Sequence, residues 1–338
     1  MYELKNVIGQ RLKTELGFIL ESSTEIKAGG NNRLFKLSSS NRNLLLKIYT
    51  THDNRQRLQR EFQAFSYLRT HGFLNIPEAF FKDDTLNYAV YSFEDGITKS
   101  AENLTRDDLN QMLGFVLKLQ DIQPDTVSEY FMPAVSACTC LQDYIKNITA
   151  RVEKFKHDSK RAHTSENIQE LRNSGYEHTI SDLVCEAIHQ YTHEELTKPI
   201  DQKDMRLSPV DFGPHNMVFK PDGTATFLDF EYFGWDDPCK LVVDFLDHDQ
   251  STGISEVDKT YFLETYLERS TVSPEILTRV KTVSRLISIE WLTCYLATLT
   301  NEKLSIRAFA DPEFNEVEYI EKQVKKYWSK LESLHKLA

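Results

Sequence analysis

The chain has 338 residues, of which 40 are Lys or Arg and 51 are Asp or Glu, so its formal net charge is −11 at pH 7. A chain of this length exceeds one ordinary hydrophobic core, and we therefore expect two lobes or domains. The acidic balance argues against nucleic acid as the main partner, because phosphate backbones are bound by basic surfaces. It is compatible with a cationic substrate, although an acidic soluble enzyme is the commoner explanation.

No apolar stretch reaches the roughly 18 residues that a membrane-spanning helix requires. The nearest candidate covers residues 286–299, but it contains Glu290, so we predict a buried helix there. The beginning of the chain lacks the pattern of a signal peptide. The cysteines are odd in number and only Cys138 and Cys140 are close in sequence, which predicts neither a disulfide framework nor a zinc site. We therefore expect a cytoplasmic protein without a membrane span.

The first hundred residues predict a small β-sheet with one helix. Apolar residues alternate there in short runs between turn signals. The expected strands cover residues 21–27, 33–38, 44–49 and 88–93. Residues 54–71 predict a helix that ends before Gly72, since glycine often follows a helix C-terminus. The change of pattern after residue 92 predicts an N-terminal lobe over residues 1–94 and a C-terminal lobe over residues 95–338.

The C-terminal lobe is predicted to be mainly helical. A helix is expected over residues 105–120, with Thr105 as its N-cap and acidic residues in its first turn. Apolar spacing predicts an amphipathic helix over residues 179–198, and helices return from about residue 257. Residues 150–175 are rich in charge and histidine and predict an exposed helix or loop.

A β-hairpin is predicted over residues 207–231, among these helices. A turn centred between residues 222 and 223 would place Asn216 opposite Asp229, with their Cβ atoms roughly 5 Å apart. An amide oxygen and a carboxylate at that separation can bind one Mg²⁺ ion, which prefers oxygen ligands. The hairpin therefore predicts a metal site.

Asp211 lies five residues before Asn216, in the loop that enters the hairpin. The order of Asp211, Asn216 and Asp229 is that of the base and the two metal ligands in kinases. The alternative interpretation is an ordinary turn with solvated acidic side chains, because an Asp and an Asn at this spacing are common by chance. Features of the first hundred residues favour the kinase interpretation.

Gly29 and Gly30 lie between two predicted strands. Glycines in such a loop let the backbone approach a phosphate group without obstruction by a Cβ atom. The alternative is an ordinary hairpin turn, and the residues alone weigh equally for both.

Lys47 lies among apolar neighbours on a short predicted strand and needs a partner. Glu61 occurs within an apolar stripe of the predicted helix 54–71. A carboxylate in such a stripe is costly unless it is paired. We therefore predict a Lys47–Glu61 ion pair that holds the lysine towards nucleotide phosphates. The alternative is a solvated glutamate on a charged helix.

Residues 88–96 form an alternating strand that runs into a polar turn ending in Gly96. Such a segment suits a hinge between lobes, where backbone N–H and C=O groups can bind an adenine edge. We predict Phe93 and Glu94 as the hinge residues.

Together these residues resemble the aminoglycoside phosphotransferase and choline kinase group, whose fold is like that of protein kinases. The resemblance covers roughly residues 20–300. It rests on residues 29–32, Lys47, Glu61, Asp211 with Asn216, Asp229 with Phe230, and residues 234–238. It implies a two-lobed α+β fold, with a small N-terminal lobe of antiparallel sheet and one helix and a larger, mainly helical C-terminal lobe.

The resemblance also implies roles for individual residues. Asp211 would be the catalytic base, Asn216 and Asp229 would bind Mg²⁺, and Lys47 would contact the α- and β-phosphates. Asn31 would join the two glycines in the nucleotide site.

Two positions depart from the family pattern. The family commonly has a histidine two residues before the catalytic aspartate, where this chain has Pro209. The aspartate usually found three residues after Pro238 is Leu241 here, and an aspartate follows only at Asp244. Residues on the acceptor side are therefore not carried over from the family.

We predict an ATP-dependent phosphotransferase, with GTP as another possible donor, that uses Mg²⁺ and phosphorylates a hydroxyl group of a small molecule. The sequence leaves the acceptor open among an aminoglycoside, choline or ethanolamine, an amino alcohol and a sugar. The alternative is a catalytically silent nucleotide-binding module, a reading that Pro209 favours. A protein kinase is a third and weaker interpretation. The metal motif is Asp-Phe-Glu, and residue 213 is glycine where serine/threonine kinases usually have lysine.

Overall fold

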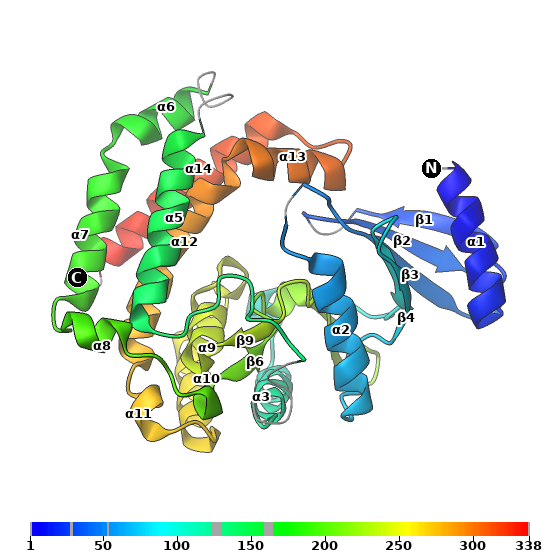
Figure 1. Cartoon of the computed structure of the whole chain (residues 1–338), viewed down its shortest axis with the longest axis horizontal. Helices are drawn as coiled ribbons and strands as arrows, with labels where there is room; N and C mark the ends of the chain where they lie inside the picture. Colours follow the sequence, from blue (N-terminus) through cyan, green and yellow to red (C-terminus); the bar gives the residue numbers. More distant parts are fainter. Residues whose placement is uncertain (1, 28–29, 53, 123–129, 159–164, 337–338) are drawn as a thin grey trace.

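The computed structural model describes residues 2–27, 30–52, 54–122, 130–158 and 165–336. A five-stranded antiparallel sheet forms the N-terminal lobe, and helices make up most of the remainder (Figure 1). The strands are β1 (Ser22–Ile26), β2 (Arg33–Ser38), β3 (Asn43–Ile48), β4 (Ala79–Asp83) and β5 (Tyr88–Ser92), in the order β1-β2-β3-β5-β4. This arrangement confirms the predicted two-lobed α+β fold.

Helices cover both faces of this sheet, because apolar side chains alternate along its strands. On one face, Leu46 of β3 packs in the same cluster as Ile8 of helix α1 (Tyr2–Leu16). On the other face, Leu45 packs against the cluster that includes helix α2 (Arg57–Thr70). The sequence predicts one helix in this lobe, so α1 is an addition that the prediction missed.

The helix predicted over residues 54–71 is α2, which begins a few residues later than predicted. Gly72 follows its end with a φ of 79°, a left-handed conformation that glycine adopts without strain. The N–H of Phe73 donates to the carbonyl of Leu68 at 3.1 Å and closes the last turn. The predicted role of Gly72 at the helix end is confirmed.

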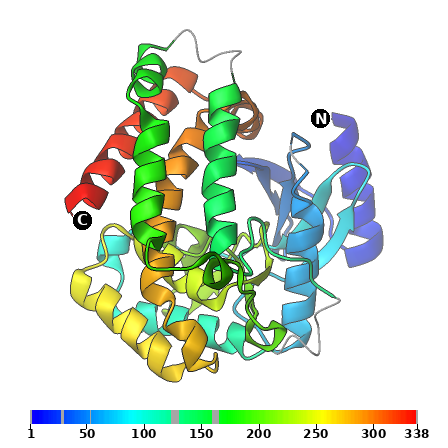
Figure 2. The same cartoon turned by 60° about the vertical axis from the view of Figure 1, so that its left-hand side comes forward.

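The C-terminal lobe is built from helices that surround a central one (Figures 1 and 2). These helices are α3 (Arg106–Gln120), α5 (Leu141–His157), α6 (Glu166–Asn173), α7 (Tyr176–Ile188), α8 (His193–Thr197), α9 (Pro238–Asp247), α10 (Glu256–Arg269), α11 (Pro274–Leu277), α12 (Val280–Thr298), α13 (Asn301–Ala310) and α14 (Glu316–Lys336). The central helix is α12, which packs against α5, α7, α9 and α14.

The buried helix predicted over residues 286–299 is part of α12. Its one acidic residue, Glu290, is buried and accepts a hydrogen bond from Arg151 at 2.5 Å. None of the helices in the described part of the chain is both long and apolar enough to cross a membrane. Residues 150–175 contain the end of α5 and all of α6, while residues 159–164 lie outside the described residues.

The two helices predicted at residues 105–120 and 179–198 have different outcomes. The first is α3, and Thr105 and Asp108 form a capping box at its start. The second is divided into α7 and α8, so a single helix there is wrong. A capping box at Thr192 begins α8 and thereby ends the continuous helix.

Two short antiparallel ladders interrupt the helices. Strand β6 (Arg206–Ser208) pairs with β9 (Gly234–Asp236), and β7 (Met217–Phe219) pairs with β8 (Ala225–Phe227). The second ladder is the predicted hairpin.

The register of this hairpin differs by one residue from the prediction. Met217 pairs with Phe227, and the N–H of Leu228 donates to the carbonyl of Asn216 at 2.8 Å. Asn216 is therefore opposite Leu228, and the predicted cross-strand pairing of Asn216 with Asp229 is wrong.

The turn explains the shift. The N–H of Lys220 donates to the carbonyl of Thr224 at 2.9 Å, so residues 221–223 form a three-residue loop. Gly223 adopts a φ of 83°, which a three-residue hairpin loop requires at its last position. A loop of three residues instead of two moves every pair of the ladder by one position.

The segment that leaves the sheet is bonded to this hairpin. Ile97 and Phe219 exchange backbone hydrogen bonds of 3.0 and 2.8 Å. Gly96 permits the close approach, because a Cβ atom there would lie 2.7 Å from the carbonyl oxygen of Phe219. The link between the lobes is thus attached to the hairpin that follows Asn216.

Candidate active site

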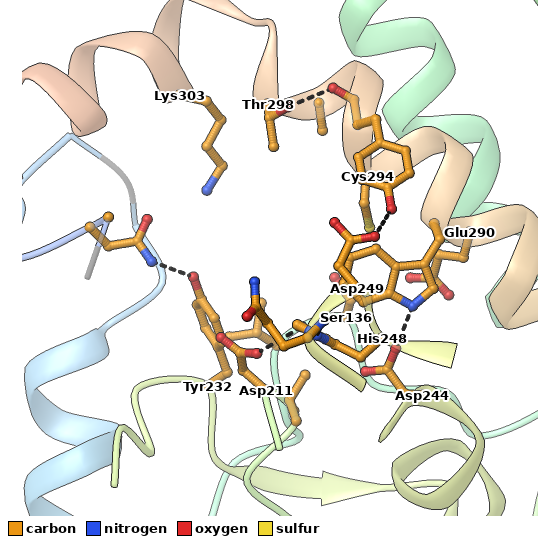
Figure 3. A pocket seen from close by; sticks show the side chains of 18 of the residues that line it. Ser136, Asp211, Tyr232, Asp244, His248, Asp249, Glu290, Cys294, Thr298 and Lys303 are labelled. Atoms are coloured by element: carbon orange, nitrogen blue, oxygen red, sulfur yellow. Dashed lines mark hydrogen bonds and ion pairs between the residues drawn. The ribbon is translucent and has the colours of Figure 1, made fainter. Parts of the chain in front are cut away.

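A cavity of about 520 Å³ is lined by residues from both lobes. Gly30 and Asn31 come from the segment between β1 and β2, while Asp211, Asn216 and Asp229 come from the loops around the hairpin. Side chains of α12 and α13 form another wall (Figure 3). The structure therefore brings together these five predicted site residues, although the predicted register was wrong.

Lys47 is buried beside this cavity, with its ammonium group among carboxylates. Its Nζ is 2.6 Å from Glu61 Oε2, 2.6 Å from Asp229 Oδ1 and 3.8 Å from Glu231 Oε2. Burial alone would lower the pKa of Lys47, but the carboxylates outweigh burial and hold this pKa well above its ordinary value. The predicted Lys47–Glu61 ion pair is confirmed, and its action on phosphates stays a prediction.

Asp229 leaves the hairpin in a left-handed conformation, with a φ of 63°. Its side chain lines the cavity and is 32% exposed. Burial and the nearby carboxylates of Glu231 and Glu61 raise the pKa of Asp229 to about 7, against the opposing effect of Lys47. Negative charge is therefore in excess at this end of the cavity.

Glu231 is a site residue that sequence reasoning missed. It is 1% exposed, and it accepts hydrogen bonds from Asn31 Nδ2 at 2.9 Å and from the side chains of Asn32 and Arg57. Burial would raise the pKa of Glu231, but Lys47 and these donors outweigh burial and lower it. Glu231 therefore joins the segment after β1, helix α2 and the segment after β8.

A signal for this network was present in the sequence. Glu231 alternates with Asp229 in an otherwise apolar run, which indicates a second carboxylate with a buried partner. Its partners lie far away in the chain, so the sequence did not identify them.

Asp211 is held by its backbone and by two imidazole rings. Val210 before it has a φ of 70°, and Asn216 Nδ2 donates to the Asp211 carbonyl at 2.9 Å. Nε2 of His215 and Nε2 of His248 lie 3.0 and 3.4 Å from Asp211 Oδ1. Burial would raise the pKa of Asp211, but the hydrogen bonds from the two histidines outweigh burial and hold this pKa well below its ordinary value. The carboxylate is therefore ionised at neutral pH.

Three predicted nucleotide-site residues lie elsewhere or outside the described residues. Gly29 is not among the described residues. Phe93 and Glu94 are absent from the cavity lining, and the Phe93 ring instead faces the ammonium group of Lys36 at 4.5 Å. Glu94 accepts from the hydroxyl of Ser92 at 2.6 Å. Contacts of the Phe93 and Glu94 backbone with a nucleotide base stay a prediction.

Helix α13 extends from the C-terminal lobe to the segment between β1 and β2. A Cβ atom at Gly30 would come within 1.0 Å of Arg307 Nη1, so a larger residue there would displace this guanidinium group. Close by, the rings of His52 and Phe309 have centroids 5.9 Å apart. Helix α13 therefore forms a further contact between the lobes.

The wall beyond Asp211 carries carboxylates beside an indole ring. Asp244 accepts a hydrogen bond from Trp291 Nε1 at 3.0 Å, and Asp249 pairs with Lys326 at 2.6 Å. Burial raises the pKa of Asp244 to about 7. This wall offers several hydrogen-bonding groups to a polar molecule.

The family model described as the phosphotransferase enzyme family matches residues 22–258, which is well over half of the chain. The chain belongs to this family. The predicted resemblance to the aminoglycoside phosphotransferase and choline kinase group is confirmed, by the family model and by the shared fold of solved structures. No curated protein matches this phosphotransferase-family chain.

Solved structures share the fold of this family member over nearly its whole length. Spectinomycin phosphotransferase APH(9)-Ia, in complex with ADP and spectinomycin, has a TM-score of 0.64 at 13% identity, covering 96% of this chain and 98% of that one. Choline kinase LicA from Streptococcus pneumoniae has a TM-score of 0.61 at 14% identity, covering 98% and 99%. The GDP and kanamycin complex of APH(2")-IIia has a TM-score of 0.63 at 16% identity, covering 97% and 98%. These similarities establish the kinase-like fold.

Proposed function

We propose that this member of the phosphotransferase family transfers the γ-phosphoryl group of ATP to a hydroxyl group of a small molecule in the cytoplasm. The observation that carries the proposal is the position of Lys47, 2.6 Å from both Glu61 and Asp229, beside a cavity that also contains Asp211 and Asn216. A lysine steadied by a helix glutamate orients the nucleotide phosphates in kinases. Positioning and charge neutralisation would then carry the catalysis.

In our proposal, the two lobes have different roles. Residues 1–94 would bind the nucleotide, with Gly29, Gly30 and Asn31 near its phosphates. Residues 93–94 would contact the base through their backbone, and residues 95–338 would supply the catalytic, metal-binding and acceptor groups. One relative was solved with ADP and another with GDP, so GTP is to be tested beside ATP.

The residues at the Lys47 end of the cavity fit a Mg²⁺ ion. Asn216 and Asp229 line the cavity and carry oxygen donors, which this hard cation prefers. The pKa of Asp229, raised to about 7 by burial and by neighbouring carboxylates, reflects a local excess of negative charge that a cation would relieve. When bound, Mg²⁺ would neutralise charge on the β- and γ-phosphate oxygens.

Asp211 would act on the acceptor. Because its pKa is lowered by the histidine hydrogen bonds, its carboxylate is available at neutral pH to accept a hydrogen bond from the acceptor hydroxyl. A carboxylate with a lowered pKa is a weak base, so it is suited to orienting the hydroxyl and to taking its proton only late in the transfer. Asp211 would therefore combine positioning with general-base catalysis.

The acceptor would be a polar small molecule, and several of the candidate classes are cationic. The similar structures include a phosphotransferase solved with spectinomycin, another solved with kanamycin, and a choline kinase. Asp244 and Asp249 beside Trp291 provide carboxylates and an aromatic surface that suit amines and hydroxyl groups. An aminoglycoside, choline or ethanolamine, an amino alcohol and a sugar are the classes to be screened.

A catalytically silent nucleotide-binding module is the second candidate. Pro209, in place of the family histidine, is the observation in its favour. The presence of Asp211, Asn216 and Asp229 in one cavity supports catalysis instead, because a silent module has no need of a base beside its metal ligands.

The deciding experiment measures ADP release from Mg²⁺–ATP, first without an acceptor and then with each acceptor class. We expect a slow basal release that rises with the true acceptor and that the variant Asp211→Asn loses. Nucleotide binding without any release in the wild-type protein, over the whole screen, would favour the silent module.

A further inference from the structure

Two histidines from different parts of the chain converge on one oxygen of Asp211. His215 belongs to the short 3₁₀ turn Pro214–Asn216, and His248 follows the end of α9. Their Nε2 atoms lie 3.0 and 3.4 Å from Asp211 Oδ1. The two rings are stacked, with centroids 4.6 Å apart and planes inclined by 13°. Figure 3 shows His248 beside Asp211 at the floor of the cavity.

The tautomer of His248 follows from its second nitrogen. The backbone N–H of Gln250 donates to His248 Nδ1 at 3.0 Å. A backbone N–H cannot accept a hydrogen bond, so Nδ1 is the unprotonated nitrogen of the ring. The ring hydrogen of neutral His248 is therefore on Nε2, the nitrogen that lies 3.4 Å from Asp211 Oδ1.

The packing of His248 fixes its ring in this orientation. Its side chain is 11% exposed, and the edge of the ring meets Trp291 with centroids 4.6 Å apart. Stacking on His215 covers one face. A donor confined in this way can hold the carboxylate of Asp211 in one rotamer.

A transition-metal site is the competing interpretation of the same three side chains. One ligand atom from each of Asp211, His215 and His248 lies within 4.8 Å of the others, which suits an ion such as Zn²⁺. A neutral histidine that binds a metal through Nε2 carries its hydrogen on Nδ1. In His248 that hydrogen would point at the N–H of Gln250, so the observed hydrogen bond opposes metal binding.

We propose that His248 is a positioning residue for phosphoryl transfer, an inference that rests on the proposed function. Together with His215 it occupies Oδ1 of Asp211. Among the described residues, none donates a hydrogen bond to Oδ2 of Asp211. The side chain of Asp211 lines the cavity and is 33% exposed. Its Oδ2 is therefore the oxygen left to accept a hydrogen bond from the hydroxyl group of the acceptor. Pro209, two residues before Asp211, has no side-chain donor to take this role.

The variants His248→Leu and His248→Gln test the inference, because a glutamine amide can place a donor near the position of Nε2. With Mg²⁺–ATP and no added acceptor, we expect His248→Leu to lower kcat for ADP release by about 10- to 100-fold. The KM for Mg²⁺–ATP should not change, and His248→Gln should recover most of the rate. His189→Leu, an exposed histidine outside the cavity lining, is the matched control and should behave as wild type. A wild-type rate in His248→Leu, or no recovery in His248→Gln, would overturn the inference.

A measurement on the wild-type protein separates this inference from the proposed function. Nitrogen-15 correlation spectra of the imidazole rings should show His248 as the Nε2–H tautomer. An Nδ1–H tautomer, or a shift of the His248 signals to a metal-bound form on addition of Zn²⁺, would overturn the inference even if the enzyme is active. The expected tautomer in a protein that releases no ADP would instead overturn the proposed function, and the positioning role with it.

Discussion

Two clusters of charged side chains lie at the same cavity, and they balance charge in opposite ways. Around Lys47, three carboxylates share the positive charges of Lys47 and Arg57. Around Asp211, a single carboxylate lies within 3.4 Å of two imidazole nitrogens. The first cluster keeps an excess of negative charge, whereas the second stabilises its one negative charge. In the proposed function this difference would make nucleotide binding and acceptor alignment separate tasks, which variants should uncouple.

The largest effect is expected from Asp229→Ala in the first cluster. The change removes the carboxylate that faces the cavity, while Lys47 keeps its ion pair with Glu61. Binding of Mg²⁺–nucleotide should be abolished in calorimetric titrations. Asp222→Ala, an exposed aspartate in the turn of the same hairpin, is the control and should bind normally. Unchanged binding by Asp229→Ala would remove this residue from the metal site.

Asp211→Asn should separate the second cluster from the first. Loss of a positioned base costs about 10²- to 10⁴-fold in kcat, while the affinity for Mg²⁺–nucleotide should stay at the wild-type level. ADP release and calorimetry on the same preparation measure both quantities. If turnover persists at the wild-type rate, or if nucleotide binding falls together with turnover, the two clusters do not have separate tasks.

Glu231→Ala tests whether the first cluster also holds the fold together. The change removes a buried charge partner of Arg57, and loss of one member of such a pair costs about 3–5 kcal/mol in the free energy of unfolding. Glu231→Gln should cost less, since its amide oxygen still accepts a hydrogen bond at one of the two positions to which Asn31 and Asn32 donate. Urea unfolding monitored by fluorescence gives both values. Equal and small losses in the two variants would argue against this structural role.

The smallest expected effect is on the pH dependence of thermal stability, and its sign should differ between the two clusters. The pKa of Asp229 is raised to about 7 in the folded state, mainly by burial. The ionisation of Asp229 therefore destabilises the fold as the pH rises from the pKa of the unfolded state towards 7. Without ligands, Asp229→Asn should therefore raise Tm by on the order of 3 °C at pH 8, with no gain near pH 4.

Asp211→Asn should do the opposite. The pKa of Asp211 is lowered in the folded state, because the histidine hydrogen bonds outweigh burial, so its charge stabilises the fold above the unfolded pKa. Its replacement should lower Tm at pH 8. Calorimetric scans of the two variants at both pH values would contradict the comparison if the two shifts had the same sign.

The parts of the site that the sequence predicted depend on local periodicity. Strand alternation placed Lys47 and a helical stripe placed Glu61, and both patterns survive folding because each lies within one regular element. The spacing from Asp211 to Asn216 was equally local. The shift of the β7–β8 register arose from one extra loop residue, since a three-residue loop closed by Gly223 competes with the two-residue turn that the sequence suggested.

The parts that the sequence missed depend on contacts between distant segments. Glu231 meets Asn31 and Arg57 only after the two lobes come together, and His248 meets Asp211 only because α9 ends beside the hairpin loop. No periodic pattern in the sequence indicates such long-range contacts. Helix α1 was missed for a different reason, because its few apolar positions have meaning only once the outer face of the sheet is known.

Two of the joins between the lobes differ in kind, namely the one where Ile97, in the link after β5, bonds to Phe219 and the one where Arg307 covers Gly30. The first join is a pair of backbone hydrogen bonds, while the second consists of side-chain contacts that rotamer changes can release. We expect that, when the lobes separate, the contact of α13 with the Gly30 segment opens before the backbone join does.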